Sequence, residues 1–131
     1  MKRFIAQISL LVRDYDEALD YYTNVLGFVL VEDTPLSPGK RWVVIRPSNV
    51  EGQGCNLLLA KASGSEQEQC IGNQAGGRVF LFLYTDDFER EHRLLVAKGV
   101  EIVRPPSSEV YGKVLVFRDL YGNLWDLIEP K

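Results

Sequence analysis

The chain has 131 residues, of which 46% are hydrophobic and 25% charged; this composition is typical of one globular domain and argues against disorder. The net charge is −3 and no Lys/Arg block stands out, so we expect no nucleic-acid partner. No apolar run approaches the roughly 20 residues that cross a bilayer, and the N-terminal segment turns polar too soon for a signal peptide, so we expect a cytoplasmic protein with no membrane partner.

The first half of the chain predicts one strand, one helix and three further strands. Residues 4–12 are rich in apolar and β-branched types and predict a strand. Asp14 is a suitable N-cap with Glu17 three residues later, and Gly27 ends the helical periodicity that follows. The next strands are expected at Phe28–Asp33, Arg41–Arg46 and Asn56–Ala60, with a loop at Pro35–Gly39 and a turn at Pro47–Gly54.

The second half repeats this order after a polar, glycine-bearing segment. A strand at Val79–Thr85 leads to Asp87 as N-cap of a second helix, which Gly99 ends. Strands are then expected at Val100–Arg104, Lys113–Phe117 and Leu124–Ile128, with Pro105–Ser108 as a loop and Asp119–Asn123 as a turn.

The recurrence of the same order is an internal repeat. It predicts a single α+β domain over 1–131, made of two βαβββ modules at about 1–61 and 78–131, with a linker at about 62–77. One amphipathic helix per four strands favours helices that cover one face of each curved sheet, which leaves the other face to line a cleft. A ferredoxin-like domain without a cleft is the alternative.

Three segments together resemble the glyoxalase / bleomycin-resistance / extradiol-dioxygenase superfamily, also called vicinal oxygen chelate. They are Ile8–Phe28, the stretch from Thr85 to Pro106, and Phe117–Pro130. The resemblance covers nearly the whole chain and implies a cupped eight-stranded mixed sheet, usually completed by dimerisation, so a homodimer is expected. It does not imply a reaction, because this fold carries isomerases, dioxygenases, epimerases, thiol transferases and drug-binding proteins.

The resemblance also implies four positions at which the enzymes of the superfamily hold a divalent metal. They fall here on Gln7, Leu58, Phe80 and Asp126, with Asn56 as a neighbour in phase with Leu58. Leu and Phe offer no donor atom, and an amide oxygen is a weak ligand. We therefore expect no metal and no other cofactor.

Strand alternation predicts which side chains face the cleft, because residues two apart share a side. The expected ligand-binding residues are Gln7, Ser9, Asn56, Leu58, Phe80, Phe82, Tyr84 and Asp126. This set describes an apolar, aromatic trough, in which Gln7 and Asp126 would be the polar groups that orient a ligand. Trp125 is expected in the core, and Arg78 and Arg41 are candidate partners for Asp126.

Three functions remain open at this point. The first is a metal-free small-molecule binding protein that holds a planar or cationic ligand against aromatic walls, with Asp126 as counter-charge. The second is a lyase, isomerase or dioxygenase-type enzyme that uses a divalent metal or Asp126 as general base. The third is a purely structural or regulatory partner domain. The alternative to a ligand cleft is that Phe80, Phe82 and Leu58 fill its space as a second core.

Overall fold

A computed structural model of the chain describes residues 1–50 and 54–131, so part of the predicted turn at Pro47–Gly54 lies outside the described residues. It divides into two compact units, unit 1 (Met1–Ile71) and unit 2 (Gly72–Lys131). The boundary falls inside the segment that the sequence predicts as a linker. None of the helices in the described ranges is long and apolar enough to cross a membrane.

Each unit contains one four-stranded mixed sheet. Unit 1 has the order β1-β4-β3-β2 and unit 2 the order β5-β8-β7-β6, so the two sheets share one topology. The strands are β1 (Gln7–Val12), β2 (Val29–Ser37), β3 (Lys40–Arg46), β4 (Asn56–Lys61), β5 (Val79–Tyr84), β6 (Ile102–Glu109), β7 (Gly112–Arg118) and β8 (Leu124–Pro130). In each sheet the first and last strands pair in parallel and the others antiparallel. The α+β class and the two βαβββ modules are confirmed.

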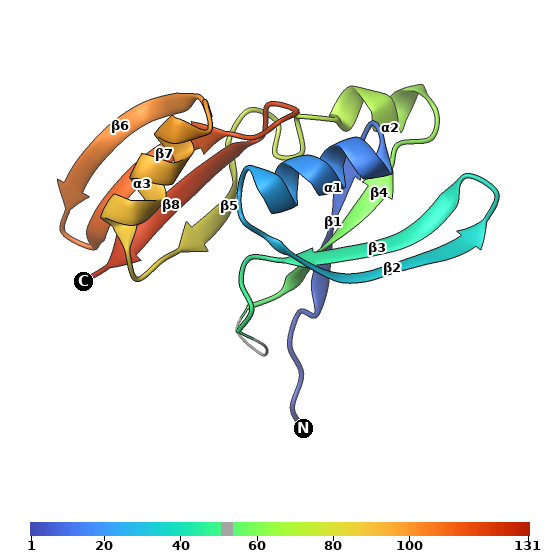
Figure 1. The fold of residues 1–131 in the computed structure, drawn as a ribbon, viewed down its shortest axis with the longest axis horizontal. Helices are drawn as coiled ribbons and strands as arrows, with labels where there is room; N and C mark the ends of the chain where they lie inside the picture. Colours follow the sequence, from blue (N-terminus) through green and yellow to red (C-terminus); the bar gives the residue numbers. More distant parts are fainter. Residues whose placement is uncertain (51–53) are drawn as a thin grey trace. The chain divides into compact units, whose positions relative to one another are not determined.

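The helices are α1 (Tyr15–Asn24), α2 (Ser65–Cys70) and α3 (Phe88–Ala97). Asp14 and Asp87 cap α1 and α3 as predicted, because the carboxylates accept hydrogen bonds from the backbone N–H groups of Glu17 (2.9 Å) and Arg90 (3.2 Å). Figure 1 shows α1 lying along the sheet of unit 1 and α3 along the sheet of unit 2. The short α2 lies within the predicted linker and has no counterpart in the second module.

Both helices end through the glycine that the sequence indicates. Gly27 and Gly99 adopt φ of +75° and +74°, where residues with a Cβ are strained. The residue after each glycine then donates its backbone N–H to a carbonyl of the last helical turns, from Phe28 to Tyr22 at 2.8 Å and from Val100 to Leu95 at 3.0 Å. This shared geometry satisfies helix carbonyls and turns the chain back toward the sheet.

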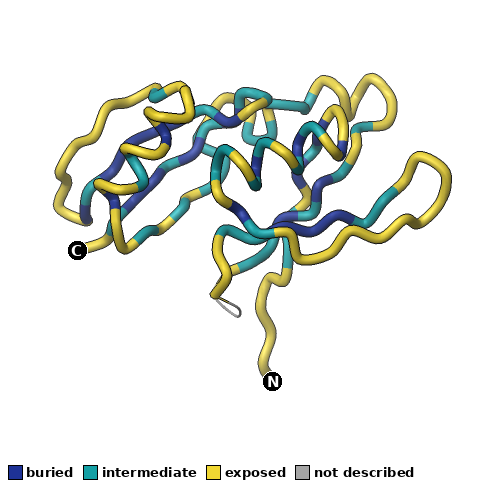
Figure 2. The backbone as a smooth tube through the Cα atoms, in the orientation of Figure 1, coloured by how far each residue is buried: buried dark blue, intermediate teal, exposed yellow. Residues whose placement is uncertain are grey.

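Apolar side chains from the helix and one face of the sheet form the core of each unit. In unit 1 these include Leu10, Val12, Ala18, Tyr22, Val43, Ile45 and Leu59, and in unit 2 Phe88, Leu95, Leu115, Phe117, Trp125 and Leu127. Trp125 is buried as predicted, and its ring stacks on Phe117 with centroids 5.8 Å apart. Figure 2 shows that burial concentrates on the central strands and that the outer strands β2 and β6 are exposed.

The predicted loop at Pro105–Ser108 is wrong, because β6 runs through it, and the loop predicted at Pro35–Gly39 is reduced to a turn at Pro38 and Gly39, because β2 continues to Ser37. Pro35 lies in β2 and Pro105 in β6. Both strands are at the edge of their sheets, and the pairing shifts register between Pro35 and Ser37 and between Arg104 and Ser107. Proline lacks an N–H, which is tolerated at a sheet edge or a bulge because no neighbouring strand needs the missing donor there.

Candidate ligand-binding site

The open face of the unit 2 sheet is the face opposite the buried core residues of β8. Trp125 and Leu127 are buried, whereas Leu124 and Asp126, on the alternate positions, are only partly covered. Leu124 and Asp126 line a cavity of about 480 Å³, together with Val79, Phe82 and Val116 among others. Asp126 therefore lies on the face that the sequence predicts for it.

The strand register places four residues in one line across this face. Phe82 pairs with Asp126, Asp126 with Val116, and Val116 with Arg104. We call these four the Asp126 row. Neighbouring strands lie roughly 4.8 Å apart. Asp126 on β8 and Arg104 on β6 are therefore two strand spacings apart, with Val116 of β7 between them. All four residues line the 480 Å³ cavity.

The carboxylate of Asp126 is a partly buried charged group on this face. In the described part of the chain no hydrogen bond or ion pair of its side chain occurs, although Arg78 and Arg104 line the same cavity. Burial raises the pKa of Asp126 above its ordinary value, and the positive charge of Arg104 opposes that rise only in part. A group that donates a hydrogen bond to the carboxylate, or that carries a positive charge, would relieve this desolvation.

A second, smaller cavity of about 100 Å³ adjoins the first, because Arg104, Val116 and Asp126 line both. Its polar lining residues include Ser107, Glu109 and Tyr111. The Asp126 row therefore has a hydrophobic side with Phe82 and a polar side with the Tyr111 phenol.

The aromatic residues of β5 do not all take the positions that simple alternation predicts. Phe82 and Tyr84 are 62% and 67% exposed and pair with Asp126 and Ile128. The register shifts between Val79 and Leu81, so Val79 pairs with Leu124 and the intervening Phe80 is the extra residue of a β-bulge. Val79 lines the 480 Å³ cavity, and Phe80 is not among its lining residues.

Gln7 and Ser9 lie on the edge strand β1 of unit 1, and Asn56 and Leu58 lie on its neighbour β4 inside the sheet. Gln7 pairs with Asn56 and Ser9 with Leu58, without any register shift. Their alternate neighbours Leu57 and Leu59 are buried in the core. These four residues therefore share the open face of the unit 1 sheet, and the convergence of Gln7 and Asp126 on one ligand stays a prediction.

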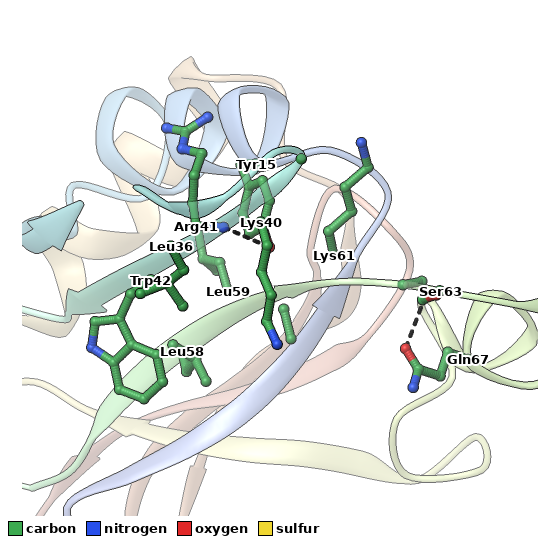
Figure 3. A pocket seen from close by; sticks show the side chains of 13 residues that line it. Tyr15, Leu36, Lys40, Arg41, Trp42, Leu58, Leu59, Lys61, Ser63 and Gln67 are labelled. Carbon is green, nitrogen blue, oxygen red and sulfur yellow. Dashed lines mark hydrogen bonds between the residues drawn. The ribbon is translucent and has the colours of Figure 1, made fainter. Parts of the chain in front are cut away.

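Unit 1 has a cavity of its own, of about 640 Å³, which the sequence did not single out. Figure 3 shows Trp42 and Leu58 side by side on its wall, with the Lys40 side chain reaching past them. Arg41, a candidate partner for Asp126, instead donates to Asp33 at 2.7 Å and to Asp16 at 2.9 Å. The sequence predicts the loop before β3 but starts that strand at Arg41; its true start at Lys40 places Lys40 and Trp42 on one face.

The donor set does not fit a metal ion. Of the four family positions, Gln7 and Asp126 carry oxygen donors, whereas Leu58 carries none, and neither Phe80 nor the bulge neighbour Val79 has one. Across residues 1–50 and 54–131, no three His, Cys, Asp or Glu side chains come together as a possible metal site. Two oxygen ligands without a fixed frame hold a divalent ion weakly.

The comparisons with known proteins agree with the two-module architecture. Residues 4–127 match the family model of the Glyoxalase/Bleomycin resistance protein/Dioxygenase superfamily, and the chain belongs to this superfamily. It is 55% identical to an uncharacterized protein of Shewanella frigidimarina, over 98% of this chain and 95% of that protein.

Two solved structures are similar in both sequence and fold. A superfamily member from Sphaerobacter thermophilus has 30% identity and a TM-score of 0.77, covering 98% of each chain. TnmS3, an antibiotic binding protein from Streptomyces sp. CB03234, has 26% identity and a TM-score of 0.76, covering 99% of this chain and 98% of its own.

Proposed function

We propose that this protein is a metal-free binding protein for a small, planar organic molecule. The observation that carries the proposal is Asp126: a desolvated carboxylate without a protein partner among the described residues, in a cavity beside an exposed phenylalanine. A small-molecule site typically combines an apolar wall with a few directed polar groups. The likeness to TnmS3, an antibiotic binding protein, supports a binding role.

The aromatic wall of this site is Phe82, with Tyr84 beside it on the same strand. Both rings are largely exposed, although aromatic side chains of this size gain about 2 kcal/mol from burial. A flat ligand laid on Phe82 covers this surface and stacks with offset or edge geometry. Such a ligand would lie next to Asp126, because Phe82 and Asp126 are paired residues on the neighbouring strands β5 and β8.

The charges of the cavity define which end of the ligand meets which residue. A cationic or hydrogen-bond-donating group suits Asp126, because it replaces the water that burial removes. Arg78 and Arg104 line the same cavity, so an acceptor elsewhere on the ligand suits them. Gln7, Ser9, Asn56 and Leu58, on the open face of unit 1, are proposed as further ligand contacts.

The test is calorimetry of wild type and the Asp126→Asn variant with two probes of one shape, the cation N-methylquinolinium and the neutral N-methyl-2-quinolone. Loss of the charge should weaken binding of the cation by roughly 1–3 kcal/mol and leave binding of the neutral probe nearly unchanged. The matched control is Asp86→Asn, which removes the same charge from an exposed residue outside the cavity lining. Equal weakening by both variants, or no binding of either probe by wild type, would contradict the proposal.

A second candidate function follows from the raised pKa of Asp126. A carboxylate whose pKa is raised by burial is a better general base near neutral pH than an ordinary aspartate. In that role Asp126 removes a proton next to a carbonyl group of the substrate, as in a lyase or isomerase. Deuterium uptake from heavy water into a panel of small ketones, lost in Asp126→Asn and kept in Asp86→Asn, would favour this function.

A further inference from the structure

We infer that the 640 Å³ cavity of unit 1 is a separate binding site for an aromatic molecule with an anionic group, such as an aryl carboxylate. This inference goes beyond the proposed function, because the charged residues that carry it belong to unit 1 and attract the opposite charge; Leu58 is the residue named in both. It rests on the charges, walls and hydrogen-bond donors of that cavity.

The lining of the cavity is cationic. Lys40, Arg41 and Lys61 line it, and no aspartate or glutamate is among its described lining residues. The chain as a whole has a net charge of −3, so a cavity lined by three basic residues and no acidic one differs in charge from the chain as a whole. Such a cavity attracts small anions and repels cations.

Two of the three basic residues have free charges. Arg41 is neutralised, because it donates to Asp33 at 2.7 Å and to Asp16 at 2.9 Å, and its guanidinium carbon lies 5.2 Å from the centre of the Tyr15 ring. Lys40 and Lys61 take part in no ion pair or side-chain hydrogen bond within the described ranges. Their ammonium groups are therefore the groups available to an incoming anion.

The walls suit an aromatic body. The Trp42 ring is only partly buried and lies beside Leu58, while Leu36 on the neighbouring strand is 54% exposed. In Figure 3 the Lys40 side chain lies between Trp42 and Lys61, with its ammonium group at the level of Leu58. Lys40 and Trp42 are two residues apart in β3 and share a face, whereas the Lys61 side chain runs the opposite way in Figure 3, so a flat ring against Trp42 would direct its carboxylate to Lys40.

Gln67 adds a directed donor at the other end of the cavity. Its carbonyl oxygen accepts the backbone N–H of Ser63 at 2.9 Å, which fixes the amide and leaves its NH₂ group for a ligand. The NH₂ group of an amide donates to an acceptor and cannot receive a cationic group. Its orientation therefore agrees with the charge of the two lysines.

The experiment is calorimetry with 2-naphthoate and its neutral isostere 2-naphthamide at low ionic strength, where exposed charges are least screened. Wild type should bind 2-naphthoate more tightly than 2-naphthamide. Lys40→Gln should lower the affinity for 2-naphthoate about 3- to 10-fold and leave the affinity for 2-naphthamide unchanged. Lys61→Gln should have a smaller effect of the same kind. Lys98→Gln, at the end of α3 in unit 2, is the matched control and should change neither ligand.

A second readout locates the bound ring. The indole N–H resonance of Trp42 should shift on addition of 2-naphthoate, whereas that of the buried Trp125 should not. Equal affinity for acid and amide, an equal effect of Lys98→Gln, or no binding at millimolar concentration would each overturn the inference. None of these results bears on Asp126, so failure here leaves the proposed function standing.

Discussion

Asp126 and Asp119 show how differently one residue type behaves within β8 and in the turn before it. Asp119 is buried, and one of its oxygens accepts the backbone N–H groups of Gly122 and Asn123 at 3.0 and 2.9 Å. Its other oxygen accepts the indole N–H of Trp125 at 3.1 Å. Asp119 therefore closes the turn before β8 and anchors a core tryptophan, which is a structural role. Asp126 has no such partner in the described chain and is the residue free to meet a ligand.

We expect Asp126 to reduce the stability of the folded protein near neutral pH. Its folded-state pKa is raised above the ordinary value of 3.8, so the ionised form is disfavoured by folding. The penalty is present above the folded pKa and disappears as the pH falls through that pKa toward 3.8. Asp126→Asn should therefore raise the free energy of unfolding at pH 7, with a gain that vanishes in acid.

Urea denaturation of wild type and Asp126→Asn at a series of pH values measures this gain. Asp86→Asn serves as control and should show no comparable pH-dependent gain. A variant that is less stable than wild type at pH 7 would show that Asp126 has a stabilising partner. A site that lowers stability until it is filled is typical of a functional position.

At the scale of elements, a close backbone contact joins the start of unit 2 to the turn before β8. A Cβ on Gly72 would lie 1.9 Å from the carbonyl oxygen of Tyr121, and Gly72 has φ of +75°. The backbone N–H of Gln74 donates to the side-chain oxygen of Asn123 at 3.1 Å in the same region. Glycine at 72 is therefore required by both space and backbone conformation.

Gly72→Ala should destabilise the protein much more than Gly76→Ala. Both glycines have positive φ, so both variants lose about 1–2 kcal/mol from backbone strain. Gly76 has open space around its Cα, whereas Gly72 must also displace Tyr121. Thermal unfolding of the two variants gives the comparison, and equal melting temperatures would mean that the turn moves away at no cost.

At the scale of the whole molecule, we expect this member of the superfamily to lack a metal site. The positions that hold ligands in the superfamily's enzymes fall here on Gln7, Leu58, Phe80 and Asp126, and two of these side chains have no donor atom. The packing of the fold depends mainly on the other face of each sheet, where the buried core lies. The homodimer expected from the resemblance stays a prediction, which sedimentation can test against the chain mass of 14.9 kDa.

We expect the purified protein to hold far less than one transition-metal ion per chain. Emission spectroscopy after incubation with Zn²⁺, Ni²⁺, Fe²⁺ or Mn²⁺ and dialysis should find only traces, because two weak oxygen donors release a divalent ion readily. About one ion per chain would refute the metal-free proposal and favour the enzyme.

Local chemistry made part of the fold predictable. Asp14 and Asp87 as caps, and Gly27 and Gly99 as stops, act through hydrogen bonds between residues close in the sequence. Such signals are readable without knowing the tertiary neighbours. The repeat of these signals with four strands in each half was enough to indicate two βαβββ modules, and Trp125 was recognised as a core residue.

The features that only the tertiary structure determines all depend on strand pairing. Pro35 and Pro105 remain in strands because β2 and β6 are edges, and the β5 bulge puts Val79 rather than Phe80 opposite Leu124. Pairing between strands far apart in sequence also aligns Phe82, Asp126, Val116 and Arg104, and forms the unit 1 cavity around Lys40 and Trp42. Two-residue alternation predicts the faces of a single strand. The register between strands determines which side chains meet across a sheet, and the sequence of one strand does not contain it.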